Sequence, residues 1–558
     1  MKRIFTMLMV CAMLISMTAG CTPSTPPATT SPPTTAPQQT TAPPPASKVL
    51  TTGFSYDATT MDVHKCNDDG SYTVLNMIGE GLTRNDDGFV SPGVAERWEI
   101  STDNLTYTFY LRKNATWSDG SPLNAYDFEY SFRRIIDPEQ GFRQATGALQ
   151  QFKNAQAYFD GECGIEDVGI KAIDEYTLEV VLENATLDAI YGFSGYARFP
   201  VNRAYVEEYG DAYGTEAHTV LTNGPFILTD WRHEDRHIMV KNENYWNKDA
   251  VMLDGFERRV NVTGNTAVDM MLVGDIDIMS FSNYDLVTSL QNGGMEVIPY
   301  VSGYQFVHFN YGGSSEQLHR FMSNTNFRRA LNFTINREAL AASVIRGATP
   351  TFRMTAPSVV GVNGLFHDEY PYQGWPMGGD TAKAKEALAL ALEELGATVD
   401  DIPELSLLAS DAGTGILVFQ AIQDMLLNTL GIKAKIDPQP VTQMLEKAYA
   451  GEWDMWWGGR SLGNLDWLES VGVIFDDTDP AQTNNYYHEG FSDLYHRART
   501  AATMKERKDL LFEIEKIVCE DPCAALVSWS MNWVVQRPGI TGLGIVSGLP
   551  NYTYLDID

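Results

Sequence analysis

Two short motifs in this sequence have the residue types and spacing of hydrolytic enzymes. The first, residues 233–237, spells H-E-x-x-H, in which a helix presents two zinc ligands one turn apart and a glutamate as general base. The flanking segments 226–231 and 238–241 are strand-like, so we expect a hairpin turn here instead of a helix. A turn does not hold His233 and His237 in ligand geometry, and we predict neither a metal site nor zinc catalysis.

The second motif, residues 459–463, spells G-x-S-x-G, the nucleophile elbow of α/β-hydrolases. A predicted strand precedes it, but an elbow also needs a helix directly after the serine and a glycine-rich upstream segment for the oxyanion hole. The sequence lacks that upstream segment. We therefore interpret Gly459, Arg460 and Ser461 as parts of a binding site, and we predict a protein that is not an enzyme and holds no cofactor.

The first residues have the pattern of an export signal. Lys2 and Arg3 precede an apolar run, 4–17, that is shorter than the roughly 20 residues of a membrane-spanning helix. This predicts a signal peptide over residues 1–20. The next residue, Cys21, follows Ala-Gly and resembles the lipobox of bacterial lipoproteins, although Thr18 stands where that pattern usually has Leu. An ordinary signal peptide is the alternative.

Residues 21–47 consist almost entirely of Thr, Pro, Ser, Ala and Gln after the cysteine. Such a composition has little apolar surface to bury and favours extended polyproline II, so we predict a disordered tether. A tether directly after a lipidated Cys21 holds a globular body away from a membrane. We therefore expect an extracytoplasmic protein that is anchored to the cell membrane by this lipid.

Composition limits the partners of the remaining chain, about 510 residues long. The full sequence has a formal net charge of −32, from 40 Lys+Arg and 72 Asp+Glu, and this acidic balance disfavours nucleic acid as a partner. Outside the cytoplasm, cysteines commonly form disulfides. Three pairings of Cys66, Cys163, Cys519 and Cys523 are compatible with the sequence; Cys519 and Cys523 are near enough to pair locally, which would leave Cys66 with Cys163.

A series of landmarks runs through the globular part in a fixed order. Aromatic and β-branched residues predict a strand over 107–112, turn residues occupy 118–122, and an apolar stripe of Phe128, Phe132 and Ile135 predicts a helix over 125–136. Together with later segments, these resemble the family 5 extracellular solute-binding proteins, the peptide-binding components of ABC importers. The matching segments are 91–98, 106–112, 117–123, 127–128, 222–226, 241–242, 245–246, 274–277, 327–331, 335–337, 420–423, 431–434 and 453–455.

The resemblance implies an α/β, two-lobe periplasmic-binding-protein-like fold (type II, large peptide-binding cluster), with a ligand cleft between lobes joined by a hinge. Lobe I would comprise residues 48–305, with an extra subdomain at about 85–215, and a return segment 527–558. Lobe II would comprise residues 306–526. The sequence supports this independently, because strands predicted at 404–409, 434–437 and 453–457 alternate with amphipathic helices predicted at 382–395, 415–430 and 441–450.

The family's known partners imply a monomer that captures a small peptide and hands it to ABC permease and ATPase subunits. In peptide-binding members an Asp after a Gly-Trp-x-Ala element binds the ligand's ammonium group. Here the matching stretch, 456–466, has Gly463 or Arg460 at that position, and Asp466 comes later. Two alternatives follow: Asp466 reaches the cleft, or an acid of Asn67-Asp68-Asp69 serves, although a solvated turn is an equal interpretation of that segment.

Four aromatic residues are further candidates for ligand contact: Tyr304, Trp456, Trp457 and Trp529. Adjacent strand residues point to opposite faces, so at most one of Trp456 and Trp457 faces the ligand, beside Gly458. Tyr304 and Trp529 lie near the two expected hinge crossings.

If none of these acids binds the amine of a ligand, Arg460 favours a ligand with a carboxylate, a phosphate or a sugar hydroxyl. The alternatives to a peptide importer are therefore the same receptor role for a non-peptide solute such as an oligosaccharide, or a ligand sensor without transport.

Overall fold

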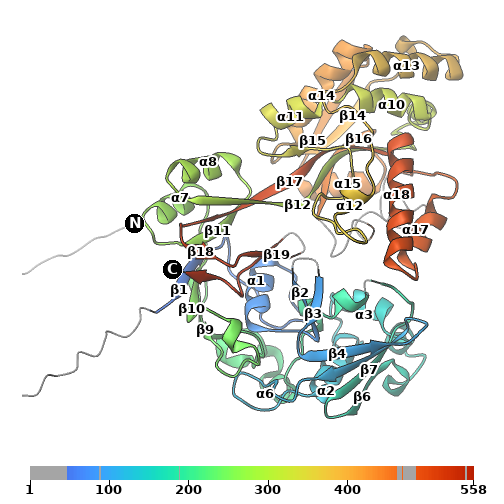
Figure 1. Cartoon of the computed structure of the whole chain (residues 1–558). Coiled ribbons are helices and arrows are strands. Elements are labelled where there is room, and N and C mark those ends of the chain that lie inside the picture. Colours follow the sequence, from blue (N-terminus) through green and yellow to red (C-terminus); the bar gives the residue numbers. More distant parts are fainter. Residues whose placement is uncertain are drawn as a thin grey trace, which may run out of the picture. The chain divides into compact units, whose positions relative to one another are not determined.

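The computed structural model describes residues 47–86, 89–187, 189–461, 468, 485–546 and 549–557 (Figure 1). The predicted signal peptide, Cys21 and nearly all of the predicted tether lie outside these residues. The described residues belong to one unit, Ser47–Asp558. None of the helices in the described ranges combines the length and apolar character needed to cross a bilayer.

The largest sheet in the described part of the chain has eleven strands. Ten follow the order β15-β14-β16-β12-β17-β11-β1-β10-β9-β8, and β13 pairs with β17. The strands are β1 (Val49–Gly53), β8 (Phe226–Arg232), β9 (Arg236–Lys241), β10 (Gly255–Arg259), β11 (Ile278–Phe281), β12 (Glu296–Phe309), β13 (Thr349–Pro350), β14 (Leu405–Ser410), β15 (Ala434–Gln439), β16 (Met455–Ser461) and β17 (Ala524–Gln536).

Two long antiparallel strands, β12 and β17, connect the two ends of this sheet (Figure 1). At one end of this pair, β11 is hydrogen-bonded to the end of β17, and at the other end β16 is hydrogen-bonded to the end of β12 and to β14. We call β8, β9, β10, β1 and β11 the first strand group, and β16, β14 and β15 the second. The predicted lobe boundaries near residues 305 and 526 fall inside β12 and β17, and the division of the chain into lobes remains a prediction.

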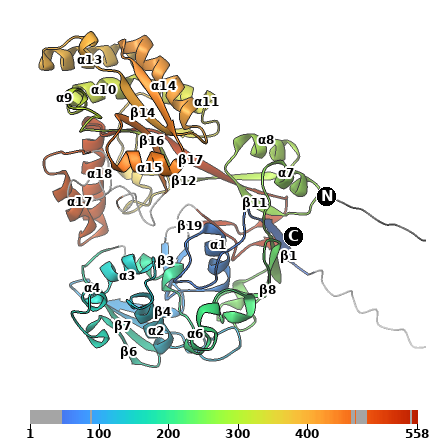
Figure 2. The ribbon, with the colours of Figure 1, turned by 180° about the vertical axis from the view of Figure 1, so that it is seen from behind.

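Helices pack on the second strand group as its alternating sequence predicts (Figure 2). The predicted helices are confirmed as α13 (Thr381–Leu395), α14 (Gly415–Leu430) and α15 (Val441–Tyr449), and the predicted strands as β14, β15 and β16. Gly396 and Gly431, with φ of 58° and 72°, end α13 and α14 in the left-handed conformation that glycine adopts at low cost. Together with α10 (Thr325–Thr334), α13 and α14 bury an apolar cluster against the sheet.

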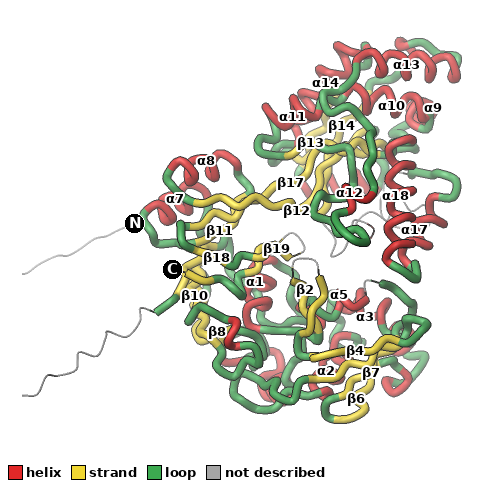
Figure 3. The backbone as a smooth tube through the Cα atoms, viewed as in Figure 1, coloured by secondary structure: helices red, strands yellow, loops and turns green. Residues whose placement is uncertain are grey.

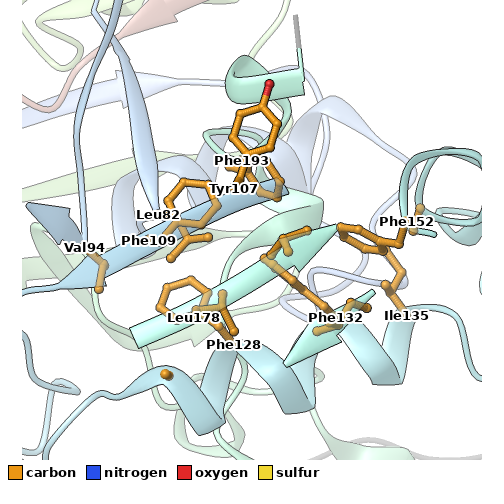
Figure 4. Close-up of a cluster of buried hydrophobic side chains, with 14 of the residues drawn as sticks. Leu82, Val94, Tyr107, Phe109, Phe128, Phe132, Ile135, Phe152, Leu178 and Phe193 are labelled. Atoms are coloured by element: carbon orange, nitrogen blue, oxygen red, sulfur yellow. The ribbon is translucent and has the colours of Figure 1, made fainter. Parts of the chain in front are cut away.

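A second, four-stranded antiparallel sheet has the order β4-β5-β7-β6. It consists of β4 (Ala95–Ile100), β5 (Thr106–Leu111), β6 (Ile170–Asp174) and β7 (Thr177–Val181). Helix α2 (Ala125–Ile135) packs on it through Phe128, Phe132 and Ile135, each fully buried (Figure 4). The predicted strand, turn and helix of this region are therefore confirmed, and the apolar stripe is a packing face.

The other elements cover these sheets and form short hairpins (Figure 3). The helices are α1 (Asp69–Ile78), α3 (Ala145–Gln151), α4 (Ala155–Phe159), α5 (Ala189–Gly192), α6 (Arg203–Tyr209), α7 (Gly264–Leu272), α8 (Tyr284–Asn292), α9 (Glu316–Met322), α11 (Arg337–Ser343), α12 (Phe366–Glu369), α17 (Phe491–Arg499) and α18 (Met504–Glu520). The hairpins are formed by β2 (Thr83–Asp86) with β3 (Phe89–Pro92) and by β19 (Gly544–Val546) with β20 (Leu549–Asn551), and β18 (Ile540–Thr541) pairs with β21 (Asp556–Ile557).

The H-E-x-x-H motif lies at a hairpin, as predicted. Strands β8 and β9 are antiparallel neighbours that close at the Arg232–Arg236 pair, and Glu234 in the turn has a φ of 61°. Both histidines approach the same carboxylate: His237 Nε2 is 3.2 Å and His233 Nδ1 3.5 Å from Asp57. No group of three or more residues suited to holding a metal ion occurs within the described ranges.

The expectation of disulfides is wrong for all four remaining cysteines, which are free thiols. Each lies in a separate local environment: the thiols of Cys66, Cys163 and Cys519 contact the carbonyls of Asp68, Asn154 and Phe352, at 3.7, 3.8 and 3.9 Å. Cys523 is completely buried. Burial raises the pKa of Cys66 to about 11 and raises that of Cys519, which lowers the thiolate fraction needed for oxidation.

Free thiols predict a simple labelling result. Iodoacetamide added to protein unfolded without reductant should alkylate all four cysteines, each located by peptide mapping with mass spectrometry. The matched control is the same protein reduced before labelling, which should give the same map. A disulfide-linked peptide pair in the unreduced sample would contradict this structure.

Candidate ligand-binding site

A cavity of about 880 Å³ lies where the α1 region meets the second strand group. Its volume is within the range of small-ligand pockets. One wall is formed by Asn67, Asp68, Asp69, Tyr72, Arg143, Gln144 and Tyr196, and the other by Ser302, Gly303, Gln305, Trp457, Gly458, Gly459, Arg460 and Ser530, with Asn532 and Leu549 also in contact. We call it the cleft cavity. Several predicted site residues that are far apart in sequence therefore line one space.

The two neighbouring acids of the α1 region have different roles. Asp68 is the N-cap of α1: its carboxylate accepts from Ser71 N at 2.7 Å and Ser71 Oγ at 2.8 Å, and also from Thr59 Oγ1. These bonds satisfy the helix start. Asp69 is exposed, and its carboxylate has no hydrogen bond or ion pair within the described residues. The predicted solvated turn is thus a helix N-terminus, and Asp69 is the acid left available to a ligand.

Asn67 contributes mainly to the shape of the same wall. Its Nδ2 donates to the carbonyl of Lys65 at 2.9 Å, and its Oδ1 accepts from Gln144 Nε2 at 3.3 Å. Gln144 also donates to the carbonyl of Cys66 at 2.7 Å. This network joins the segment before α1 to the start of α3 and fixes the position of Asp69 beside the cavity.

The glycines of β16 are required by its close approach to β12. A Cβ atom on Gly459 would lie 3.0 Å from the Tyr304 carbonyl oxygen, and one on Gly458 would lie 3.2 Å from His308 Nε2. Both distances are tighter than ordinary side-chain contacts. The small residues therefore let β16 pair with β12, and the next residue, Arg460, lines the cavity half-buried.

The adjacent tryptophans of β16 point to opposite faces, as predicted. Trp456 is 3% exposed, stacks on His308 with ring centroids 4.7 Å apart, and packs beside Trp453. Trp457 is half-buried and lines the cleft cavity. Of these two tryptophans, only Trp457 therefore presents its ring to the cavity, and Trp456 is a core residue.

Tyr304 and Trp529, which were candidates because they lie near the expected hinge crossings, do not line the cleft cavity. They are directly opposite each other in the β12–β17 ladder, their rings pack edge to face at 6.4 Å, and they are 0% and 2% exposed. Their side chains lie on the strand face that packs into an apolar cluster with Phe306 and Leu526. Both rings have a packing role in this structure, and their contact with a ligand remains a prediction.

The end of the G-x-S-x-G motif is only partly described. Strand β16 continues through Ser461, whose backbone pairs with Gly303. The residues that follow, including Asp466, lie outside the described residues, and so does the side chain of Ser461. The predictions for Ser461 and Asp466 as ligand contacts therefore remain predictions.

A second cavity, of about 540 Å³, adjoins the first strand group and shares Asp69, Tyr72, Asn532 and Leu549 with the cleft cavity. We call it the inner cavity. Its lining includes Glu80, Arg84 and Arg258, none of which was a candidate from sequence. The sequence of β10 could have indicated Arg258, because a charged residue on a buried strand face is unusual. Phe256 and Arg258 share one face of this strand and are 0% and 1% exposed.

Glu80 in this lining is held by neighbouring side chains. Its carboxylate accepts from Tyr245 OH at 2.6 Å and from the indole of Trp246. Burial raises the pKa of Glu80, although these bonds and the nearby arginines oppose the shift. Glu80 is consequently a fixed part of the wall.

Comparison with known proteins gives relatives along most of the chain. Residues 90–481 match the family described as bacterial extracellular solute-binding proteins, family 5 Middle. The dipeptide-binding protein DppE of Bacillus subtilis is 29% identical over 482 residues, which cover 85% of each chain. The oligopeptide-binding protein OppA of the same organism is 27% identical over 481 residues, which cover 84% of this chain and 85% of OppA.

Solved structures give the same result for the fold. The unliganded open form of the periplasmic murein tripeptide-binding protein MppA matches with a TM-score of 0.76 at 23% identity, covering 89% of this chain and 94% of that chain. The predicted α/β class and periplasmic-binding-protein-like fold are therefore confirmed.

The two tryptophans of β16 provide a paired prediction. Trp456→Ala should lower the free energy of unfolding by about 3–5 kcal/mol, because it removes a buried ring. Trp457→Ala should cost about 1 kcal/mol, because that ring is half-buried, and should weaken ligand binding. Urea denaturation followed by fluorescence measures the free energy of unfolding of both variants. Equal losses of stability would contradict the assignment of faces.

Proposed function

The chain belongs to family 5 of the bacterial extracellular solute-binding proteins, and from this membership we propose that it captures small peptides outside the cytoplasm and delivers them to the permease of an ABC importer. The observation that carries the proposal is the cleft cavity, whose two walls come from the α1 region and from β12 and β16. A ligand that contacts both walls stabilises their approach, because it binds that arrangement more tightly.

The chemistry of the walls supports a peptide as the ligand. Asp69 supplies an acceptor for an ammonium group, and a charge-assisted bond of this kind is strong in a site that excludes water. Trp457 and Tyr72 supply flat apolar surfaces for side chains. The names of DppE and OppA also support peptides as the ligand class.

The N-terminal segment supports attachment to the membrane. We infer that Cys21 carries lipid after removal of residues 1–20, and that the Pro- and Thr-rich tether lets the receptor reach its permease. A monomer suffices for this role, since both walls of the cavity come from one chain.

Thermal unfolding with di- to pentapeptides tests the function. A peptide at a hundredfold excess over its Kd should stabilise the protein by about 2.7 kcal/mol, and N-acetylation of the peptide should remove most of this effect. A shift with oligosaccharides and with no peptide would contradict peptide capture and favour a receptor for another solute.

The neighbouring acids give a matched pair of variants. Asp69→Asn should weaken binding of peptides with a free amine by about tenfold or more, with little change in stability. Asp68→Ala should lower the free energy of unfolding by about 1 kcal/mol through loss of the helix cap, with a smaller effect on affinity. Calorimetric titration and urea denaturation separate the two effects. Unchanged peptide affinity in Asp69→Asn would show that another group binds the amine.

A further inference from the structure

Two arginines line the inner cavity, and their surroundings differ. Arg84 is compensated: its Nη2 donates to Asp86 at 2.9 Å, its Nη1 donates to Tyr554 OH at 2.6 Å, and Nη1 is 4.0 Å from Glu80. The positive charge of Arg84 is thus balanced by the protein itself.

Arg258 has no such carboxylate. Within the described residues, no Asp or Glu oxygen lies within ion-pair distance of its guanidinium, and its Nη2 is buried without a hydrogen-bond partner. Its polar neighbour is His237, with Nη1 and Nδ1 3.4 Å apart, and its Cζ lies 4.1 Å from the ring centroid of Phe54. Burial lowers the pKa of Arg258 to about 10, although the charge of Asp57 opposes this shift.

This arrangement is costly for a residue with a purely structural role. A buried guanidinium needs a paired anion or a full set of acceptors, and an apolar side chain of similar volume packs the same place without that cost. Phe256, two residues earlier on the same face of β10, is an apolar residue of this kind and is fully buried. Arg258 lines the inner cavity, which has the size of a ligand pocket. Thr52 of β1, its register partner, lines the same cavity.

We propose that Arg258 is a specificity-determining residue that binds a carboxylate of the ligand in the inner cavity. The inference rests on the proposed function, and it deepens that function by assigning one residue of the site to a carboxylate of the ligand. Asp69 lines both cavities, so a zwitterionic ligand can place its ammonium group there and extend its carboxylate toward Arg258. The carboxylate belongs to an acidic side chain or to the peptide C-terminus, two sources with the same chemistry.

Calorimetric titration of the purified protein with matched tripeptides tests the proposal. Ala-Glu-Ala against Ala-Gln-Ala tests the side chain, and Ala-Ala-Ala against its C-terminal amide tests the terminus. The wild type should prefer the acid of at least one pair by about tenfold or more. Arg258→Met should reduce that preference to less than about twofold, and Arg258→Lys should keep part of it.

Arg259→Met is the matched control. Arg259 is the next residue of β10, its Nε contacts Glu257 at 3.1 Å, and it is absent from the cavity lining, so the preference should persist. Arg258→Met should unfold at an equal or higher temperature than the wild type, because a buried charge without a paired carboxylate is removed. A lower unfolding temperature together with an unchanged preference would assign Arg258 a structural role and overturn the proposal.

Glutarate, a dicarboxylate without a peptide bond, separates this inference from the proposed function. If no tripeptide binds but glutarate binds the wild type and not Arg258→Met, the carboxylate site stands and peptide capture fails. If peptides bind but each acid and its neutral partner bind equally, peptide capture stands and the carboxylate site is wrong. If no probe distinguishes the wild type from Arg258→Met, the carboxylate site is likewise wrong.

Discussion

The antiparallel pairing of β12 with β17 holds the two strand groups together in one sheet. These strands share a ladder from Glu296–Gln536 to His308–Ala524, with irregularities at Val301/Gly303 and Gln305/Phe306. One end of the ladder carries β11 and the first strand group, and the other carries β16 and the second. Ser302 and Ser530, near the first irregularity, line the cleft cavity, and Ser302 Oγ donates to the Ser530 carbonyl at 3.2 Å. The site is therefore formed where the ladder passes from one group of strands to the other.

Neighbouring residues at the cleft cavity have different roles: one packs or caps, and the next is available to a ligand. Asp68 caps α1, whereas Asp69 is exposed to both cavities. Trp456 packs against His308, whereas Trp457 lines the cleft cavity. In the strand the cause is the alternation of side chains between faces, and in the helix it is the use of the cap residue by backbone donors. A change of register by one residue would exchange these roles, so the pairing of β16 with β12 determines the chemistry of the cleft cavity.

Much of this fold could be predicted from the sequence, because local patterns and packing agree. The stripe of α2, the alternation in β14 to β16 and the hairpin at residues 233–237 depend on periodicity and turn chemistry that neighbouring residues already contain. The errors concern distant partners. Cys66 is buried in an apolar cluster whereas the Cys163 thiol contacts the Asn154 carbonyl, so export alone does not predict which cysteines pair. Tyr304 and Trp529 were named as ligand contacts from their place in the chain, which does not determine the strand face, and both rings pack in an apolar cluster. Arg258 was missed because its significance depends on which carboxylates do not reach it, and only the folded structure shows this.

Hydrogen–deuterium exchange with and without a saturating peptide shows whether one ligand contacts both walls of the cleft cavity. We expect the backbone amides of residues 67–72 and 457–460 to gain protection together, at the same peptide concentration, while helices α13 and α14 change little. Protection of only one of these segments, or protection confined to other regions while the peptide still stabilises the protein, would show that the ligand does not join the two walls.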